Sequence, residues 1–171
     1  HTHEHVDEVF RAIPETGYVA IDGDTVVCKH SGEAALRAAG GICAAVDAVI
    51  NKDVDNAFCL SRPPGHHAER HRAMGFCLFC NPAIGAYQAR KEHGLQRVAV
   101  IDFDVHHGNG TQDVLWDDPD MFYASTHESP LFPGTGSEGE MGVAGNILNT
   151  PLASGAGSYE FRKAMEDRVF P

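Results

Sequence analysis

Apolar and polar positions alternate in blocks along this chain, and the blocks predict strands and helices in turn. Residues 98–101 form an unbroken apolar run rich in β-branched residues, which is typical of a parallel strand covered on both faces. Residues 58–60 and 121–125 are expected to form two further buried strands. Because these segments alternate with helical ones, we expect an α/β fold with a mainly parallel sheet.

Helices are indicated by apolar residues at helical spacing and by residues that favour helix ends. Thr2 can cap a first helix, and Ser31 can cap an alanine-rich helix that runs to about residue 50. Pro82 near the start and Gly94 beyond the end bracket another helix. Shorter features are expected as strands over residues 18–21 and 25–28, a helix from residue 111 and an amphipathic helix over residues 158–169. We see neither a repeat nor a linker, so residues 1–171 are expected to form a single domain.

Composition narrows the classes of partner and compartment. The chain has 171 residues, 43% of them hydrophobic, and its 13 Lys+Arg against 24 Asp+Glu give a net charge of −11, which argues against a nucleic-acid partner. No apolar run is long enough to predict a membrane span. The five scattered cysteines favour reduced thiols, and the Cys77–Cys80 pair lacks a second pair, so we expect core thiols. With no charged-then-apolar leader after His1, we expect a cytoplasmic protein.

Charged residues follow the strand predicted over residues 98–101 directly. Asp102, Asp104 and His106 occupy alternate positions, so their side chains would share one face of an extended strand. Two carboxylates and an imidazole are costly to bury without a cation or hydrogen-bond partners. Ligands also bind at the carboxyl ends of parallel strands. A metal site is the favoured interpretation, and a structural carboxylate–histidine cluster that caps the next helix is the alternative.

A tandem pair of histidines follows another predicted strand. Pro63 and Pro64 stiffen the backbone and Gly65 lets it turn, which would present His66 and His67 at the same edge of the sheet. A histidine oriented by a carboxylate is a common general acid or base because its pKa lies near neutral pH. The alternative is that the two imidazoles are supporting or surface residues.

Four motifs in this order, RPPGHHA, MGFCLFCNPAI, VIDFDVHHGNGTQ and STHESPLFPGTG, resemble the histone deacetylase family of zinc amidohydrolases. The likeness is to class II deacetylases and their bacterial relatives, including acetylpolyamine amidohydrolases, and it covers nearly the whole chain. The resemblance implies a three-layer α/β/α sandwich of the arginase/deacetylase type, incomplete at its C-terminus. It also implies removal of acetyl groups from acetyl-lysine peptides or acetylated polyamines by the amino-terminal part of a deacetylase catalytic domain.

The resemblance implies roles for individual residues. Asp104 and His106 are similar to two of the family's three zinc ligands. His66 and His67 are similar to its tandem active-site histidines, with Asp102 as the carboxylate partner of His66. On this basis His67 would be the base that takes a proton from zinc-bound water and later protonates the leaving amine.

Further positions are similar to the family's substrate channel and to its second cation site. Gly75, Phe76 and Phe132 would line a narrow channel for an acylated, lysine-like chain. Family members also hold a monovalent cation, usually K⁺, near the Zn²⁺. The residues that match this second site are Asp102, Asp104, His106, Ser125 and Thr126.

Two departures from the family pattern affect the expected chemistry. Asn109 stands where some members have an aspartate behind the second histidine, and without that carboxylate less would favour the charged form of His67. The family's third zinc ligand and its oxyanion-stabilising tyrosine have no counterpart here. We therefore expect the 171-residue chain by itself to be inactive, to hold zinc weakly and to self-associate through an uncovered sheet edge.

Two other functions remain open at this point. A binuclear manganese ureohydrolase of the arginase type shares the fold, but a second metal needs further bridging carboxylates, and the chain offers His107, Gly108 and Asn109 after His106. A non-catalytic protein that binds acylated ligands or partners is favoured by the missing ligand and tyrosine.

Overall fold

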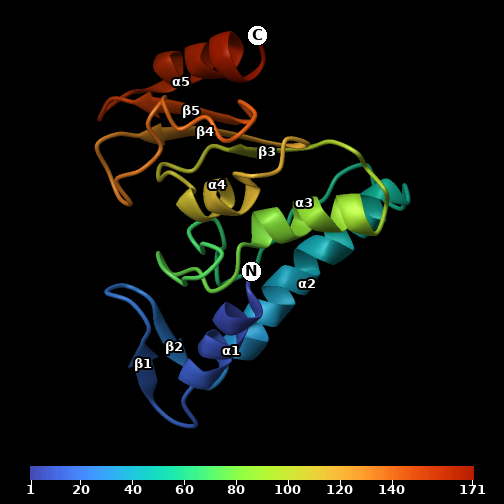
Figure 1. Cartoon of the computed structure of the whole chain (residues 1–171), viewed down its shortest axis with the longest axis vertical. Helices are drawn as coiled ribbons and strands as arrows, with labels where there is room; N and C mark the ends of the chain where they lie inside the picture. Colours follow the sequence, from blue (N-terminus) through green and yellow to red (C-terminus); the bar gives the residue numbers. More distant parts are fainter.

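A computed structural model describes all of residues His1–Pro171 (Figure 1). The helices are α1 (His3–Ala12), α2 (Ser31–Ile50), α3 (Asn81–Lys91), α4 (Asn109–Leu115), α5 (Ser158–Ala164) and the short π-helix η1 (Met165–Val169). The strands are β1 (Tyr18–Ala20), β2 (Val26–Cys28), β3 (Val98–Asp102), β4 (Met121–Glu128) and β5 (Ile147–Leu152). None of these helices is both long and apolar enough to cross a membrane.

Strands β3, β4 and β5 form a parallel sheet in that order, which confirms the predicted α/β fold. Helices α4 and α5 lie on opposite sides of the three strands (Figure 1). The register aligns Asp102 of β3 with Ser125 of β4, and Ser125 with Asn149 of β5. A row of polar side chains therefore crosses the sheet close to the carboxyl ends of its strands.

Two hydrophobic clusters hold the molecule together. The larger one joins the sheet to α3 and α4 and includes Leu115, Met121, Tyr123 and both thiols of the Cys77–Cys80 pair, as predicted for core cysteines. The smaller one joins α1 to the antiparallel hairpin β1–β2, which projects from the opposite end of the molecule to α5 (Figure 1). Burial of this kind stabilises a fold by about 25 cal/mol per Å² of apolar surface.

One strand prediction is wrong, and another is right only in part. Residues 58–60 form no strand, and Phe58 and Leu60 are 87% and 92% exposed, because no neighbouring strand supplies backbone partners there. Residues 98–101 form strand β3 as predicted, but its side chains are only partly buried, where the prediction is of a strand covered on both faces, and it pairs with β4 at one edge alone. The apolar pattern identified both segments as strand-like, but it does not state how many neighbours are present.

Strand β5 was not predicted. It contains Asn149 and Pro151, residues that are depleted in strands. Proline is tolerated here because β5 is an edge strand, and edge strands do not need every backbone N–H as a donor.

Of the two predicted helix caps, that of Thr2 is confirmed and that of Ser31 is wrong. Thr2 accepts a hydrogen bond from the backbone N–H of His5 and caps α1 as expected. Ser31 does not cap α2, because its hydroxyl accepts a hydrogen bond from the backbone N–H of Cys28 and so holds the end of β2 instead. The last predicted helix is present as α5 continued by η1.

Candidate active site

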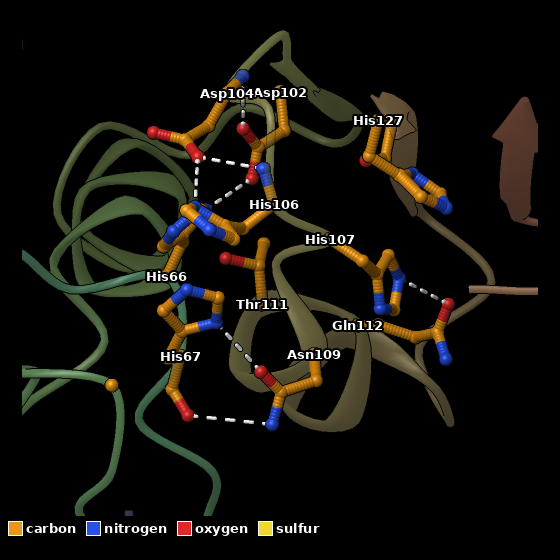
Figure 2. A network of polar contacts seen from close by, with 12 residues as sticks. His66, His67, Asp102, Asp104, His106, His107, Asn109, Thr111, Gln112 and His127 are labelled. Carbon is orange, nitrogen blue, oxygen red and sulfur yellow. Dashed lines mark hydrogen bonds and ion pairs between the residues drawn. The ribbon is translucent and has the colours of Figure 1, made fainter. Parts of the chain in front are cut away.

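The polar residues that follow β3 meet the histidines of the loop over residues 62–68 (Figure 2). Strand geometry ends at Asp102, and Asp104 and His106 lie on the bend beyond it. Their backbones are held by carboxylates, since Asp104 N–H donates to Asp102 Oδ1 at 3.1 Å and His106 N–H donates to Asp104 Oδ1 at 2.8 Å. The three residues gather as predicted, but turn hydrogen bonds bring them together rather than strand alternation.

His66 is paired with the buried carboxylate of Asp102. Its Nδ1–H donates to Asp102 Oδ2 at 2.9 Å, and the hydroxyl of Tyr123 donates to the same oxygen at 3.3 Å. Burial by itself lowers the pKa of His66, but the hydrogen bond and negative charge of Asp102 outweigh it and raise that pKa above 6.5. Tyr123 was not identified from the sequence, because its position inside an apolar strand carries no signal of this contact.

His67 lies against His66 but has a different environment. The two ring centroids are 4.0 Å apart, and His67 Nδ1 forms a 2.9 Å hydrogen bond with Asn109 Oδ1. Burial and the neighbouring charge of His66 lower the pKa of His67, although Asn109 partly opposes them. The pair therefore combines an imidazole that favours the charged form with one that favours the neutral form, a pattern typical of acid–base sites.

Asp104 and His106 are the site's candidate metal donors. Their side chains lie together at an Oδ1–Nδ1 distance of 3.2 Å, and both are partly exposed. A carboxylate oxygen and an imidazole nitrogen are suitable zinc donors, but a catalytic zinc has three protein ligands. No group of three His, Cys, Asp or Glu side chains in the chain is placed to hold a metal. The donor types fit zinc, and their number falls one short.

Aromatic and glycine residues border the histidines. The Phe132 ring lies 5.1 Å from the His67 ring and 6.1 Å from the His106 ring, measured between centroids. Gly75 has a left-handed φ of 57°, and a Cβ atom there would lie 2.5 Å from the His67 ring. Phe76 follows Gly75 in the chain and is 63% exposed. Of the three predicted channel residues, Gly75 and Phe132 thus lie against His67.

The residues predicted for the monovalent cation lie on β3 and β4 and on the bend after β3. Ser125 is buried opposite Asp102, and its hydroxyl can donate to His127 Nδ1 at 2.9 Å, which leaves oxygen lone pairs free. Thr126 follows Ser125 in the strand, so its side chain points to the other face, where its buried hydroxyl has no partner. Only a backbone carbonyl of Thr126 could face the same ion as Ser125.

His107 points away from the histidine pair and joins a separate polar network (Figure 2). Its Nε2 donates to Gln112 Oε1 at 3.1 Å, and its Nδ1 accepts from the Thr135 hydroxyl at 2.8 Å. Gln112 in turn donates to Glu140 at 2.6 Å. Burial and the nearby His127 lower the pKa of His107 to about 4, so this ring is neutral near pH 7. Both ring nitrogens of His107 are therefore engaged in hydrogen bonds within the protein, and His107 is not placed as a ligand for a second metal.

The histone deacetylase domain family matches the whole chain, residues 1–171. The chain belongs to the histone deacetylase family. Among curated members, it is 42% identical over 171 residues to the histone deacetylase-like amidohydrolase of Pseudomonas aeruginosa, covering 98% of this chain and 45% of that protein. Family membership agrees with the resemblance carried by the four sequence motifs.

Solved structures of the histone deacetylase family share the fold. The HDA15 HD domain matches all of this chain and 49% of its own at 37% identity, with a TM-score of 0.94. The acetylpolyamine aminohydrolase from Burkholderia pseudomallei matches 85% of this chain and 44% of its own at 36% identity, with a TM-score of 0.80. The chain spans about half the length of the curated relatives it matches, between 40% and 56% for the first three.

Proposed function

We propose that this polypeptide is the amino-terminal part of a zinc-dependent deacetylase acting on acetyl-lysine side chains or acetylated polyamines. The observation that carries the proposal is the His66–His67 pair beside Asp104 and His106, with one histidine on a carboxylate and the other on an amide. Membership of the family supports amide hydrolysis, and the names of its relatives include a deacetylase-like amidohydrolase and an acetylpolyamine aminohydrolase.

Asp104 and His106 would hold the zinc ion in this proposal, with a third ligand from outside residues 1–171. Bound zinc would supply Lewis-acid chemistry, polarising the amide carbonyl and lowering the pKa of a water molecule. A monovalent cation such as K⁺ would lie near Asp102, Ser125 and the Thr126 carbonyl. The Ser125 hydroxyl supports this placement, because its hydrogen can be donated to His127 while its oxygen stays available.

The histidines would divide the proton transfers between them. His67 favours the neutral form and its Nδ1 is occupied by Asn109, so its Nε2 can accept a proton from the attacking water and later give it to the leaving amine. Asp102 would stabilise the charged form of His66 beside it. Gly75, Phe76 and Phe132 would guide the acylated chain towards these groups, since a small glycine and two aromatic rings leave space for a slender aliphatic stem.

Assays of the full-length protein carrying these residues test the proposal. We expect hydrolysis of an acetyl-lysine peptide or an acetylpolyamine, inhibition by a hydroxamate, and loss of turnover after chelation that added Zn²⁺ restores. His67→Ala should lower kcat by about 10²- to 10⁴-fold, the usual contribution of a general acid–base group. Glu33→Gln, which removes an exposed helix pair with Arg37, is the matched control. Undiminished turnover without metal would refute zinc dependence, and two manganese ions per chain would favour a ureohydrolase.

The 171-residue chain alone is proposed to be catalytically inactive, because it offers two zinc donors. The same shortage favours a second candidate role for this piece by itself, the binding of acylated ligands without hydrolysis. Zinc content, turnover and binding of an acetyl-lysine peptide, measured on one preparation, separate the two. Stoichiometric zinc together with turnover would contradict the proposed inactivity.

A further inference from the structure

Asn109 connects His67 to a carboxylate that lies one residue further away. Its Oδ1 faces His67 Nδ1 at 2.9 Å, and its Nδ2 donates to Glu69 Oε1 at 2.6 Å. Asn109 itself is 5% exposed, so its amide group is largely shielded from water. The carboxylate of Glu69 therefore lies behind His67, with the Asn109 amide group between the two.

The Glu69 carboxylate determines which way the Asn109 amide is turned. An ionised carboxylate only accepts hydrogen bonds, so the NH₂ group must face Glu69. The other groups near this nitrogen, Met74 Sδ at 3.3 Å and the backbone oxygen of His67 at 3.5 Å, are acceptors as well. The amide oxygen is left to face His67, which must then carry its proton on Nδ1 and keep the lone pair of Nε2 free.

Glu69 is itself held in place. Arg72 Nη2 lies 3.3 Å from Glu69 Oε2, and the backbones of the two residues form an isolated β-bridge, with Glu69 N–H donating to Arg72 O at 2.9 Å. The Glu69 side chain is 29% exposed, whereas that of Arg72 is 57% exposed. The chain of contacts thus runs from a solvated guanidinium through Glu69 and Asn109 to the buried ring of His67.

We propose that Glu69 is a positioning residue for His67: by orienting the Asn109 amide, it keeps the proton of the neutral imidazole on Nδ1 and leaves Nε2 free. Its consequence for turnover rests on the proposed function, in which His67 transfers protons through Nε2. The tautomer itself does not rest on that function. Because the Glu69 side chain contacts Asn109 and Arg72 but neither Asp104 nor His106, its effect on His67 passes through Asn109.

Tautomer-specific ¹⁵N spectra of selectively labelled histidine in the full-length protein test the first part, with His67 assigned by substitution. We expect the Nδ1–H form in the wild type and in Glu69→Gln, because the glutamine Oε1 can still accept from Asn109. Glu69→Ala should weaken this preference, since only the longer contacts to Met74 Sδ and the His67 backbone oxygen then hold the Asn109 NH₂ group in place. Glu33→Gln serves as the matched control, and circular dichroism checks that each variant is folded. An unchanged tautomer in a folded Glu69→Ala protein would overturn the proposal.

Exchanging the amide group at position 109 and the carboxylate group at position 69 gives a second, independent test. Asn109→Asp alone places a second carboxylate against Glu69, where like charges repel, so the His67 contact should be disturbed. Combining it with Glu69→Gln leaves one carboxylate oxygen to accept from His67 and lets the glutamine NH₂ donate to the other. A carboxylate oxygen at position 109 only accepts from His67, so both variants should keep the Nδ1–H form, and the double variant should recover the free energy of unfolding that the single variant loses. Equal stability of the single and double variants in urea denaturation would contradict the coupling.

Steady-state kinetics on the same variants separate the positioning role from the proposed function. Glu69→Ala should lower kcat by about 10- to 100-fold with KM little changed, as for other outer hydrogen-bond partners of site histidines, and Glu69→Gln should retain most of the rate. If the wild-type protein shows no deacetylase turnover, the proposed function is refuted. The ¹⁵N spectra still test the tautomer of His67 in that case. Normal kcat in Glu69→Ala alongside an altered tautomer would overturn the claim that Glu69 supports turnover.

Discussion

Asp102 accepts hydrogen bonds on both of its carboxylate oxygens beside the histidine pair. Its Oδ2 accepts from His66 and from the Tyr123 hydroxyl, and its Oδ1 accepts from the backbone N–H of Asp104. Burial alone would raise the pKa of Asp102, but the hydrogen bond and charge of His66 outweigh it and lower that pKa. A single carboxylate therefore supports the charge of His66 and also shapes the bend that carries the metal donors.

Asp102→Asn is expected to lower the pKa of His66, because burial is then opposed by the smaller effect of the Asp104 charge alone. In the wild type, the raised pKa of His66 gives a stabilising contribution that is present below pH 6.5 and lost as the pH rises through the folded-state pKa. The lowered pKa of Asp102 adds a contribution that is lost as the pH falls below 3.8. NMR titration of His66 checks the shift, with Asp120→Asn, at the exposed partner of Arg90, as control. An unchanged His66 titration would contradict it.

Gly75→Ala should destabilise the protein and disturb His67. The residue has a left-handed φ of 57°, and the new Cβ would lie 2.5 Å from the imidazole ring. We expect a loss of about 1–3 kcal/mol in the free energy of unfolding, measured by urea denaturation. Gly139→Ala is the control, because a Cβ there would have nothing within 4 Å. Equal stability of the two variants would show that this close approach is relieved at no cost.

At the scale of elements, the loop between β4 and β5 depends on one carboxylate. Glu140 accepts hydrogen bonds from the backbone N–H groups of Gly136 and Ser137, and from the Gln112 side chain that also contacts His107. Burial alone would raise the pKa of Glu140, but these donors outweigh it and lower that pKa to about 2. The loop is thereby tied to the buried network beneath the carboxyl end of the sheet.

Glu140→Gln should make the free energy of unfolding depend less on pH in the acid range. Because the pKa of Glu140 falls from 4.5 to about 2 on folding, its contribution is present above pH 4.5 and disappears as the pH falls towards 2. The wild type should therefore lose more stability than the variant across this window, as measured by denaturant melts at several pH values. Glu138→Gln is matched in position and charge, and its exposed pairing with Arg168 should contribute little. Parallel pH profiles for wild type and Glu140→Gln would argue against the loop anchor.

At the scale of the whole molecule, several large apolar side chains are exposed, and the sheet ends in a strand with an unpaired edge. Strand β3 has a neighbour on one side only, and Phe58, Leu60 and Phe103 are largely exposed. Such edges and patches favour pairing with another chain.

We expect the 171-residue chain to self-associate in a concentration-dependent manner. Replacing Phe58 and Leu60 with lysine should shift sedimentation profiles towards the monomer, because charge opposes apolar contact and edge pairing. Replacing the exposed Tyr159 and Phe170 of the C-terminal segment is the control. A wild-type chain that sediments as a monomer at high concentration would refute the expectation.

The sequence by itself determined the α/β class, most of the helices, the strands that end in polar residues and the motifs of the family. These features depend on local periodicity and on residue types next to strand ends, which the linear pattern records. Only the tertiary structure decided that Tyr123 contacts Asp102, that Glu69 stands behind Asn109, that residues 58–60 form no strand and that β5 exists. The Glu69–Asn109 contact joins residues 40 positions apart. Such contacts depend on how turns place side chains in space and on which strands have neighbours, and neither leaves a periodic trace in the sequence.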